Sequence, residues 1–348
     1  MSLLSLRLFH TPHVSLSSLA LWTSLTTLSA CHPTPAALSS TPKPATAAES
    51  LITLLAETGG SSHYLLPNPQ DLASLPQSAE NPLTPEKVRL GKMLFHETAL
   101  SFVSKNDRNG SWSCASCHFS AAGFQDQRVQ SIADGGSGDG SSRHILTETT
   151  PHSHLDAPNL RSPSILNLGY QHNVLWNGMS GGVGDNLNYL TRWDKTKPHG
   201  FNHLKLDGVE TQAVIALGAH RQTHDHMLYE SATEPLSVLN EYPEYRLLFA
   251  MAFPDRDISR ETMGLAIAAY ERTVLSTQAP FQRFLNGDTA ALSTEELQGA
   301  QLFFGKAGCV TCHTGPALNQ ENYYALGFKD MEVEFGPAPD AATRKGRG

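Results

Sequence analysis

The sequence predicts a mainly α-helical protein built from two related domains with long irregular loops. A helical stretch that ends in Leu94-Phe95 recurs, with similar spacing of its glycine and apolar positions, in a stretch that ends in Leu302-Phe303. Runs that alternate apolar and polar residues, which would indicate strands, are scarce. Glycine-rich stretches such as residues 134–140, DGGSGDG, favour loops over regular elements.

Length and composition indicate a globular protein. The chain has 348 residues, of which 40% are apolar and 17% charged, and this length is enough for two domains with buried cores. Its formal charge of −8 argues against nucleic acid as a partner, because phosphate binding requires a basic surface. The 16 histidines favour metal or cofactor chemistry.

Residues 1–31 have the layout of a lipoprotein signal peptide. Residues 14–30 are uncharged and apolar or small, and small residues stand directly before Cys31. A cleaved signal with an incidental cysteine, or a membrane anchor, would have a similar composition. We interpret Cys31 as a lipidation site, since each buried methylene of an acyl chain contributes about 0.8 kcal/mol to membrane binding. We therefore expect a periplasmic protein with a lipid anchor as its one membrane contact, in the outer membrane because His32 rather than aspartate follows the cysteine.

The next segment, residues 32–80, is rich in proline, alanine, serine and threonine, which is typical of a flexible tether. We expect the ordered part of the chain to begin near Asn81. It should contain an N-terminal domain over residues 81–279 and a C-terminal domain over residues 280–348.

Capping residues and apolar periodicity predict three helices in these domains. One begins after Thr84, with Pro85 in the first helical position, and one after Ser293, with Glu296 completing a capping box. A third covers residues 259–275. The positions that form an apolar stripe on one face are Met263, Ile267, Tyr270 and Val274 in the third helix, and Leu297, Ala300 and Phe304 in the second.

Four of the five cysteines form two C-x-x-C pairs, each followed directly by a histidine. Two thiols on one helical turn can reach both vinyl groups of a haem, and the adjacent histidine can ligate the iron. A zinc site would place the two pairs close together, and a thioredoxin-like motif would lie in a βαβ unit. Disulfides in an exported protein are a further alternative, but they do not explain the two histidines. We predict two covalently bound c-type haems, attached through Cys114, Cys117, Cys309 and Cys312, with His118 and His313 as iron ligands.

A series of short motifs runs from about Asn81 to the end of the chain. They include Leu90-Gly91-Lys92-Met93-Leu94-Phe95, Gly123-Phe124-Gln125-Asp126, Leu175-Trp176-Asn177-Gly178, Glu210-Thr211-Gln212-Ala213 and Ala268-Ala269-Tyr270-Glu271-Arg272-Thr273. In order and spacing they resemble the bacterial di-haem cytochrome c peroxidase superfamily, which includes the methylamine-utilisation-type di-haem oxidases. The resemblance implies two cytochrome c-like domains, with the peroxidatic haem in residues 81–279 and the electron-transfer haem in residues 280–348.

The resemblance also implies a function. A member of this superfamily would reduce hydrogen peroxide to water with electrons from a small c-type cytochrome or a cupredoxin. Two alternatives are a di-haem oxidase that modifies a partner protein and a di-haem electron carrier without catalysis. By resemblance alone we expect a homodimer. A calcium ion between the domains belongs to the same pattern, although Arg161 stands near the position where relatives offer an asparagine ligand.

Site residues follow from the same resemblance. Trp176 would lie between the haems and bridge electron transfer, and Gln212 would lie in the peroxide pocket. Ten residues after Gln212, relatives have a glutamate where this chain has Gln222, and an amide cannot transfer a proton as a carboxylate does. His220 and His224 flank that position and are candidates for the missing acid–base group, because histidine titrates near neutral pH. The alternative is that both are surface histidines.

Two further departures concern the iron ligands. Many relatives have a distal histidine about 16 residues after the proximal one, where this chain reads Ser131-Ile132-Ala133-Asp134. We therefore expect a five-coordinate or water-bound first haem that needs no reductive activation. Relatives also continue beyond the position of Gly348 with the sixth ligand of the second haem, a methionine or a tyrosine. We expect that ligand to lie outside this sequence.

Overall fold

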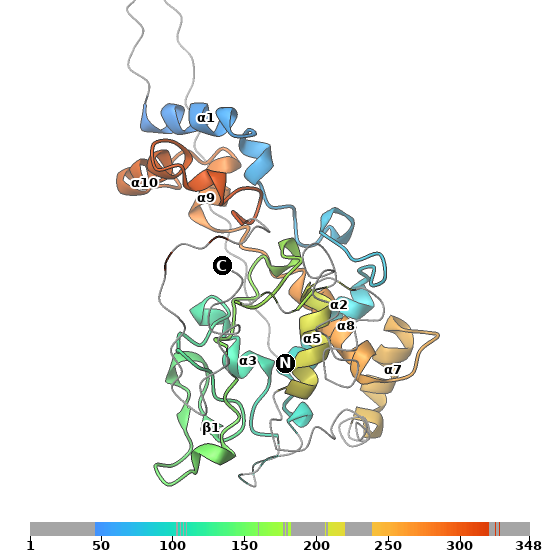
Figure 1. The fold of residues 1–348 in the computed structure, drawn as a ribbon. Helices are drawn as coiled ribbons and strands as arrows, with labels where there is room; N and C mark the ends of the chain where they lie inside the picture. The colour runs from blue at the N-terminus through green and yellow to red at the C-terminus, as the bar shows by residue number, and fades with distance from the viewer. Residues whose placement is uncertain are drawn as a thin grey trace, which may run out of the picture. The chain divides into compact units, whose positions relative to one another are not determined.

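The computed structural model describes residues 46–101, 110–158, 160–176, 208–219 and 239–319, together with Ser104, Asn106, Arg108, Gly178, Ser180, Gly181, Leu206, Tyr324 and Gly327. These residues form helices joined by long loops (Figure 1). The regular strands among them are β1 (Gly136–Ser137) and β2 (His144–Ile145), which pair antiparallel with Gly136 opposite Ile145. The prediction of a mainly α-helical chain with long loops is confirmed. No helix in the described part of the chain is long and apolar enough to cross a membrane.

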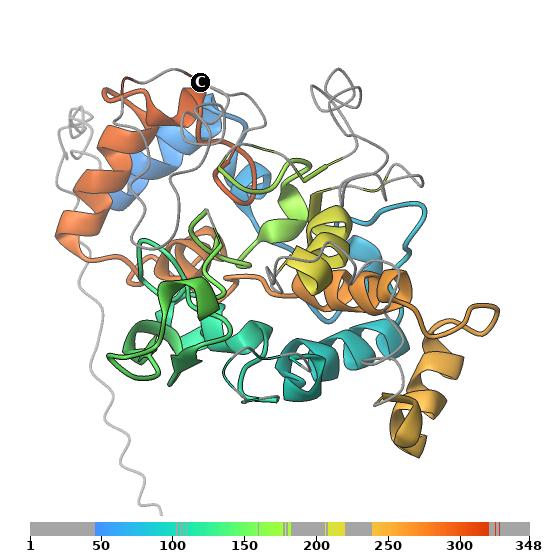
Figure 2. The ribbon, with the colours of Figure 1, turned by 60° about the horizontal axis from the view of Figure 1, so that its bottom comes forward.

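The first hydrophobic cluster forms where α2 (Pro85–His96) and α5 (Gly208–Ala219) pack against α8 (Arg260–Glu271), with α7 (Pro243–Ala252) against α2 (Figure 2). Its buried side chains include Leu90, Leu94, Phe95, Val209, Leu265 and Ile267. A Cβ added at Gly91 would lie 1.8 Å from the carbonyl oxygen of Ala266. The backbones of α2 and α8 therefore touch at this glycine.

The predicted helix starts are confirmed by hydrogen bonds. The Thr84 side chain accepts from the Lys87 amide at 3.2 Å, and Pro85 occupies the first turn of α2. Ser293 and Glu296 form the predicted capping box at the start of α10 (Thr294–Phe304). The third predicted helix, α8, ends at Glu271 rather than near Leu275. The backbone N–H of the loop residue Asn167 donates to the Val274 carbonyl at 2.9 Å. This hydrogen bond holds the chain after α8 in a turn.

The second hydrophobic cluster contains α1 (Ala47–Glu57), α9 (Pro280–Leu285), α10 and the 3₁₀ turn η1 (Ser61–Tyr64). Its buried members are Leu51, Leu55, Tyr64, Phe284 and Phe304. The Gln282 side chain joins α9 to the end of η1. Its Nε2 donates to the Tyr64 carbonyl at 2.9 Å, and its Oε1 accepts from the Leu66 backbone amide at 2.8 Å.

This second cluster corrects the expectation that residues 32–80 are a tether and that order begins near Asn81. From Thr46 onward the segment is folded: Thr46 and Glu49 form a capping box, and α1 packs along α10 (Figure 1). The composition of the segment, which is dominated by small residues and proline, suggested a flexible chain. It did not indicate the helix on which Leu51 and Leu55 share one face and are fully buried. Residues 32–45, and the signal segment with Cys31, lie outside the described residues.

Candidate functional site

The first C-x-x-C-H motif forms a single helical turn, α3 (Cys114–Cys117). The Ser113 amide donates to the Ser116 hydroxyl at 3.2 Å, and the His118 amide donates to the Cys114 carbonyl at 2.9 Å. One turn of helix therefore carries both thiols and the histidine. This is the local arrangement that attachment of a haem at two thioethers requires.

Both cysteines and His118 line a single cavity that is partly open to solvent. The other walls come from α5, from α8 and from the segment before α3. The lining also includes Glu97, Gln212, Ala213, Leu217, Ile267 and Glu271.

The chemistry of these residues fits a haem. Burial raises the pKa of the Cys114 and Cys117 thiols to about 12, so both are uncharged. Burial lowers the pKa of His118, which favours the neutral ring that binds iron. The buried Nδ1 of His118 makes no hydrogen bond within the described part of the chain. The cavity thus presents two neutral thiols and a neutral imidazole to one volume.

Gln212 reaches this cavity from α5, so the structure places it beside the first motif. Trp176 lies outside the lining of the cavity and is 49% exposed. Three other predicted residues, His220, Gln222 and His224, lie outside the described residues, as does Cys31.

Ser131, Ile132 and Ala133, where many relatives have a distal histidine, are buried. The Ile132 carbonyl accepts a hydrogen bond from the Arg143 guanidinium, and the Cys117 thiol lies 3.8 Å from the same oxygen. Among the described residues that line the cavity, His118 is the one histidine.

Glu271 is a cavity residue to which the sequence assigned no role. It is 3% exposed, and its Oε2 has no hydrogen-bond partner among the described residues. Burial and, to a smaller extent, the Glu210 carboxylate raise its pKa, Arg272 opposes both, and the resulting pKa is about 8. One signal was available in the sequence. Glu271 follows Met263 and Ile267 at intervals of four, which puts a carboxyl group on the apolar face of its helix.

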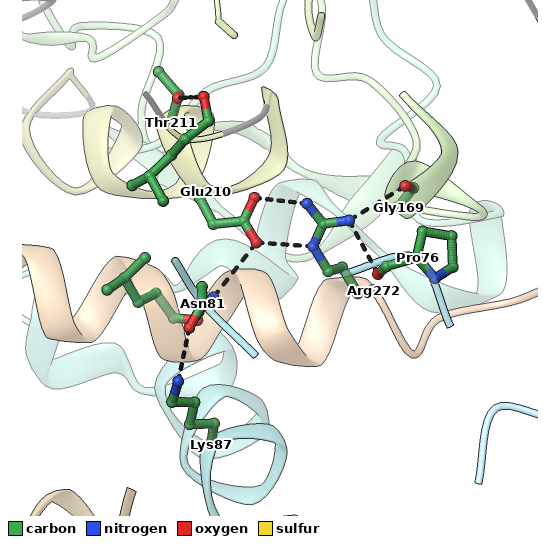
Figure 3. Close-up of polar contacts among 9 residues, drawn as sticks. Pro76, Asn81, Lys87, Gly169, Glu210, Thr211 and Arg272 are labelled. Carbon is green, nitrogen blue, oxygen red and sulfur yellow. Dashed lines mark hydrogen bonds and ion pairs between the residues drawn. The ribbon is translucent and has the colours of Figure 1, made fainter. Parts of the chain in front are cut away.

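A buried ion pair fixes α5 to the end of α8 (Figure 3). Arg272 donates from Nε and Nη2 to the two carboxylate oxygens of Glu210 at 2.8 and 2.7 Å, and neither side chain is more than 2% exposed. Asn81 donates to Glu210 at 3.4 Å and accepts from Lys87 at 3.1 Å. Glu210 is two residues from Gln212, and Arg272 directly follows Glu271. The pair therefore fixes the backbone that carries both cavity residues.

The second C-x-x-C-H motif begins with the 3₁₀ turn η11 (Cys309–Thr311). His313 Nδ1 lies 3.1 Å from the Leu318 carbonyl oxygen and donates to it, because a carbonyl can only accept. That hydrogen bond selects the tautomer whose Nε2 carries the lone pair for a metal. The contact with its own loop thus leaves Nε2 of His313 available to ligate a metal.

No group of three or more histidine, cysteine, aspartate or glutamate side chains suited to a metal ion occurs in the part of the chain that the structure describes. Arg161, near the position where relatives offer an asparagine to calcium, donates to Gln125 at 3.0 Å. The calcium ion therefore stays a prediction from resemblance.

Comparison with known proteins identifies relatives. The sequence model of the di-haem cytochrome c peroxidase family matches residues 85–290. The chain is 29% identical over 257 residues to the methylamine utilization protein MauG of Methylorubrum extorquens, covering 74% of this chain and 57% of that protein. It is 32% identical over 263 residues to the cytochrome-c peroxidase IdrP1 of Denitromonas iodatirespirans, covering 74% and 54%.

Further matches have similar extent. The cytochrome c551 peroxidase of Nitrosomonas europaea is 27% identical over 260 residues, covering 74% of this chain and 61% of that protein. A crystal structure of a MauG-like protein associated with microbial copper homeostasis matches with a TM-score of 0.49 at 25% identity, covering 78% of this chain and 61% of that one. The chain spans between about half and three fifths of the length of these relatives.

Proposed function

Because the chain belongs to the di-haem cytochrome c peroxidase family, we propose that it is a periplasmic peroxidase that reduces hydrogen peroxide to water. One observation carries the proposal: a single cavity brings Gln212 together with Cys114, Cys117 and His118. A haem attached at this motif would therefore face a polar side chain within the same cavity. Relatives named as cytochrome c peroxidases support oxidoreductase chemistry of this kind.

The roles of the chain's own residues follow from their chemistry. Cys114 and Cys117 would hold the porphyrin through thioethers, and the half-buried His118 would ligate the iron. When bound, the haem would supply the iron that takes up peroxide and the electrons that reduce it. The Gln212 amide would donate a hydrogen bond to a peroxide oxygen and orient the molecule. Ala213, Leu217 and Ile267 would exclude bulk water.

The complete reaction is H₂O₂ + 2 e⁻ + 2 H⁺ → 2 H₂O, so it needs an electron source. We propose that Cys309, Cys312 and His313 hold a second haem, which receives electrons from a small c-type cytochrome or a cupredoxin. Trp176 is the proposed bridge between the two centres.

Cellular location and assembly belong to the same proposal. A lipid on Cys31 would anchor the protein in the outer membrane, with the folded part in the periplasm. A homodimer and a calcium ion are proposed from family resemblance alone.

A second function is favoured by one sequence feature. Gln222 stands where peroxidases of the family have a glutamate, and one relative is named for methylamine utilization. An oxidase that uses the same haem chemistry to modify a partner protein would have a different requirement for that proton-transferring group. A non-catalytic carrier is less well supported, because a carrier needs no cavity beside its haem.

Two measurements test the proposed function on the full mature protein. Mass spectrometry should give a mass increase of two haems, and purified protein should consume peroxide continuously with a reduced c-type cytochrome as donor. The variant Cys114→Ser with Cys117→Ser should lose one haem and the activity together. Two bound haems without peroxide consumption would contradict the peroxidase, and fewer than two haems in the native protein would contradict both enzymatic readings.

A further inference from the structure

Two carboxyl groups line the cavity of the first haem motif, and one of them, that of Glu97, accepts hydrogen bonds through both oxygens. The Glu97 carboxylate accepts from the Tyr245 hydroxyl at 2.6 Å through one oxygen and from the Ala99 amide at 2.9 Å through the other. Glu271 leaves its Oε2 without a partner among the described residues, although the residue is 97% buried. A buried carboxyl oxygen without a partner is unfavourable for folding and therefore suggests a role in function.

The neighbouring cation does not neutralise Glu271. The Arg272 guanidinium directs Nε and Nη2 to the carboxylate of Glu210, and its Nη1 lies 3.2 Å from the Pro76 carbonyl and 3.3 Å from the Gly169 carbonyl (Figure 3). The groups that interact electrostatically with Glu271 include Glu210, Arg272, the Cys114 thiol and the Tyr270 hydroxyl. These hydrogen bonds of Arg272 go to Glu210 and to two backbone carbonyls, and its charge opposes but does not cancel the rise in the pKa of Glu271.

We propose that Glu271 is the group that transfers a proton between the two oxygens of peroxide in this cavity. The inference rests on the proposed function and assigns to α8 the task that Gln222 cannot perform. Glu271 lines the same cavity as Gln212, so one side chain can orient the substrate while the other moves a proton. Burial raises the pKa of Glu271 to about 8, and a general acid–base group works best with a pKa near the working pH.

The Glu271 carboxylate takes the proton from the oxygen nearer the iron and gives it to the outer oxygen. The O–O bond breaks, and the outer oxygen leaves as water with the bonding pair. The inner oxygen takes two electrons from the reduced cytochrome or cupredoxin by way of the haems, and two protons from solvent, to form the second water.

Cyanide provides a test that does not depend on turnover. Hydrogen cyanide must lose a proton to bind iron as an anion, whereas imidazole binds as a neutral molecule. In the full-length di-haem protein, Glu271→Gln should slow cyanide association by about 10²- to 10⁴-fold, the range of general acid–base effects, and leave imidazole affinity unchanged. Glu271→Asp should recover part of the rate, because it keeps a carboxyl group. The matched control is Glu261→Gln, which removes a carboxylate of the same helix that pairs with Arg256 at the surface.

The outcomes separate this inference from the proposed function. Cyanide association at the wild-type rate in Glu271→Gln would overturn it. Failure of both Glu271→Gln and Glu271→Asp to retain haem would assign a structural role and would also overturn it. If native protein consumes no peroxide but cyanide association still depends on Glu271, the peroxidase proposal fails and the acid–base role of Glu271 is supported.

Discussion

The ring centroids of Phe303 and His313 lie 6.0 Å apart at an interplanar angle of 49°. Phe95 and His118, at the equivalent positions of the first repeat, lie 6.2 Å apart at 50°. Each phenylalanine is near the end of a capped helix, α2 or α10. The internal repeat in the sequence therefore corresponds to a repeated contact between a helix end and a candidate iron ligand.

The repeat supplies a matched pair of glycines. Gly91→Ala should lower the free energy of unfolding by about 1–3 kcal/mol, a typical cost of overpacking, because the new Cβ would overlap the Ala266 carbonyl. Gly299, its counterpart on α10, has no atom within 4 Å of an added Cβ. Gly299→Ala should stabilise the protein by about 0.5–1 kcal/mol, since alanine is the better helix former. Urea unfolding curves check both changes, and similar shifts in the two variants would contradict the close contact of α2 with α8.

The buried ion pair between Glu210 and Arg272 should be important for stability. Arg272→Ala should lower the free energy of unfolding by about 3–5 kcal/mol, because it leaves the Glu210 carboxylate buried without a partner. The control is Arg256→Ala, which breaks a partly exposed pair with Glu261 and should change stability by about 0–1 kcal/mol. Denaturant midpoints of the two variants test this difference. Equal midpoints would show that the Glu210–Arg272 pair makes no special contribution.

Glu271 should make stability depend on pH. Its pKa in the folded protein is about 8, above the value of about 4.3 for an unperturbed glutamate, so the folded state binds its proton more tightly than the unfolded state. The contribution of Glu271 is therefore fully present below about pH 4 and decreases as the pH rises to 8, by at most about 1.4 kcal/mol per pH unit. Glu271→Gln should gain stability relative to wild type across this range. Parallel curves of unfolding free energy against pH for the two proteins would contradict the raised pKa.

Gln212 should affect peroxide reduction without affecting haem attachment. Gln212→Leu should lower kcat/KM for peroxide by about 10²- to 10³-fold, the effect of removing one preorganised hydrogen-bond donor. Absorbance of the attached haem should be unchanged, because Gln212 is on α5 and both attachment cysteines of this cavity are on α3. Steady-state kinetics with a reduced c-type cytochrome measure the effect. Unchanged kcat/KM would remove Gln212 from the reaction.

The sequence alone determined the features that depend on neighbouring residues. Two C-x-x-C-H motifs, each on one turn, follow from local geometry, and the starts of α2, α8 and α10 follow from capping hydrogen bonds within three residues. The order of motifs identified the family. The proposals for Cys31, His220, Gln222 and His224 still depend on the sequence alone, because these residues lie outside the described part of the chain.

The tertiary structure decided which distant segments meet. Composition suggested a tether before Asn81, but Leu51 and Leu55 are buried against residues more than two hundred positions later in the chain. The repeat suggested that Gly91 and Gly299 are equivalent, yet only Gly91 lies at a helix crossing. In the sequence Glu271 is one residue of a family motif, and the packing of α5, α8 and α3 places it in the cavity that His118 also lines. Burial and an unpartnered oxygen depend on the packing of segments far apart in sequence, and local periodicity does not specify that packing.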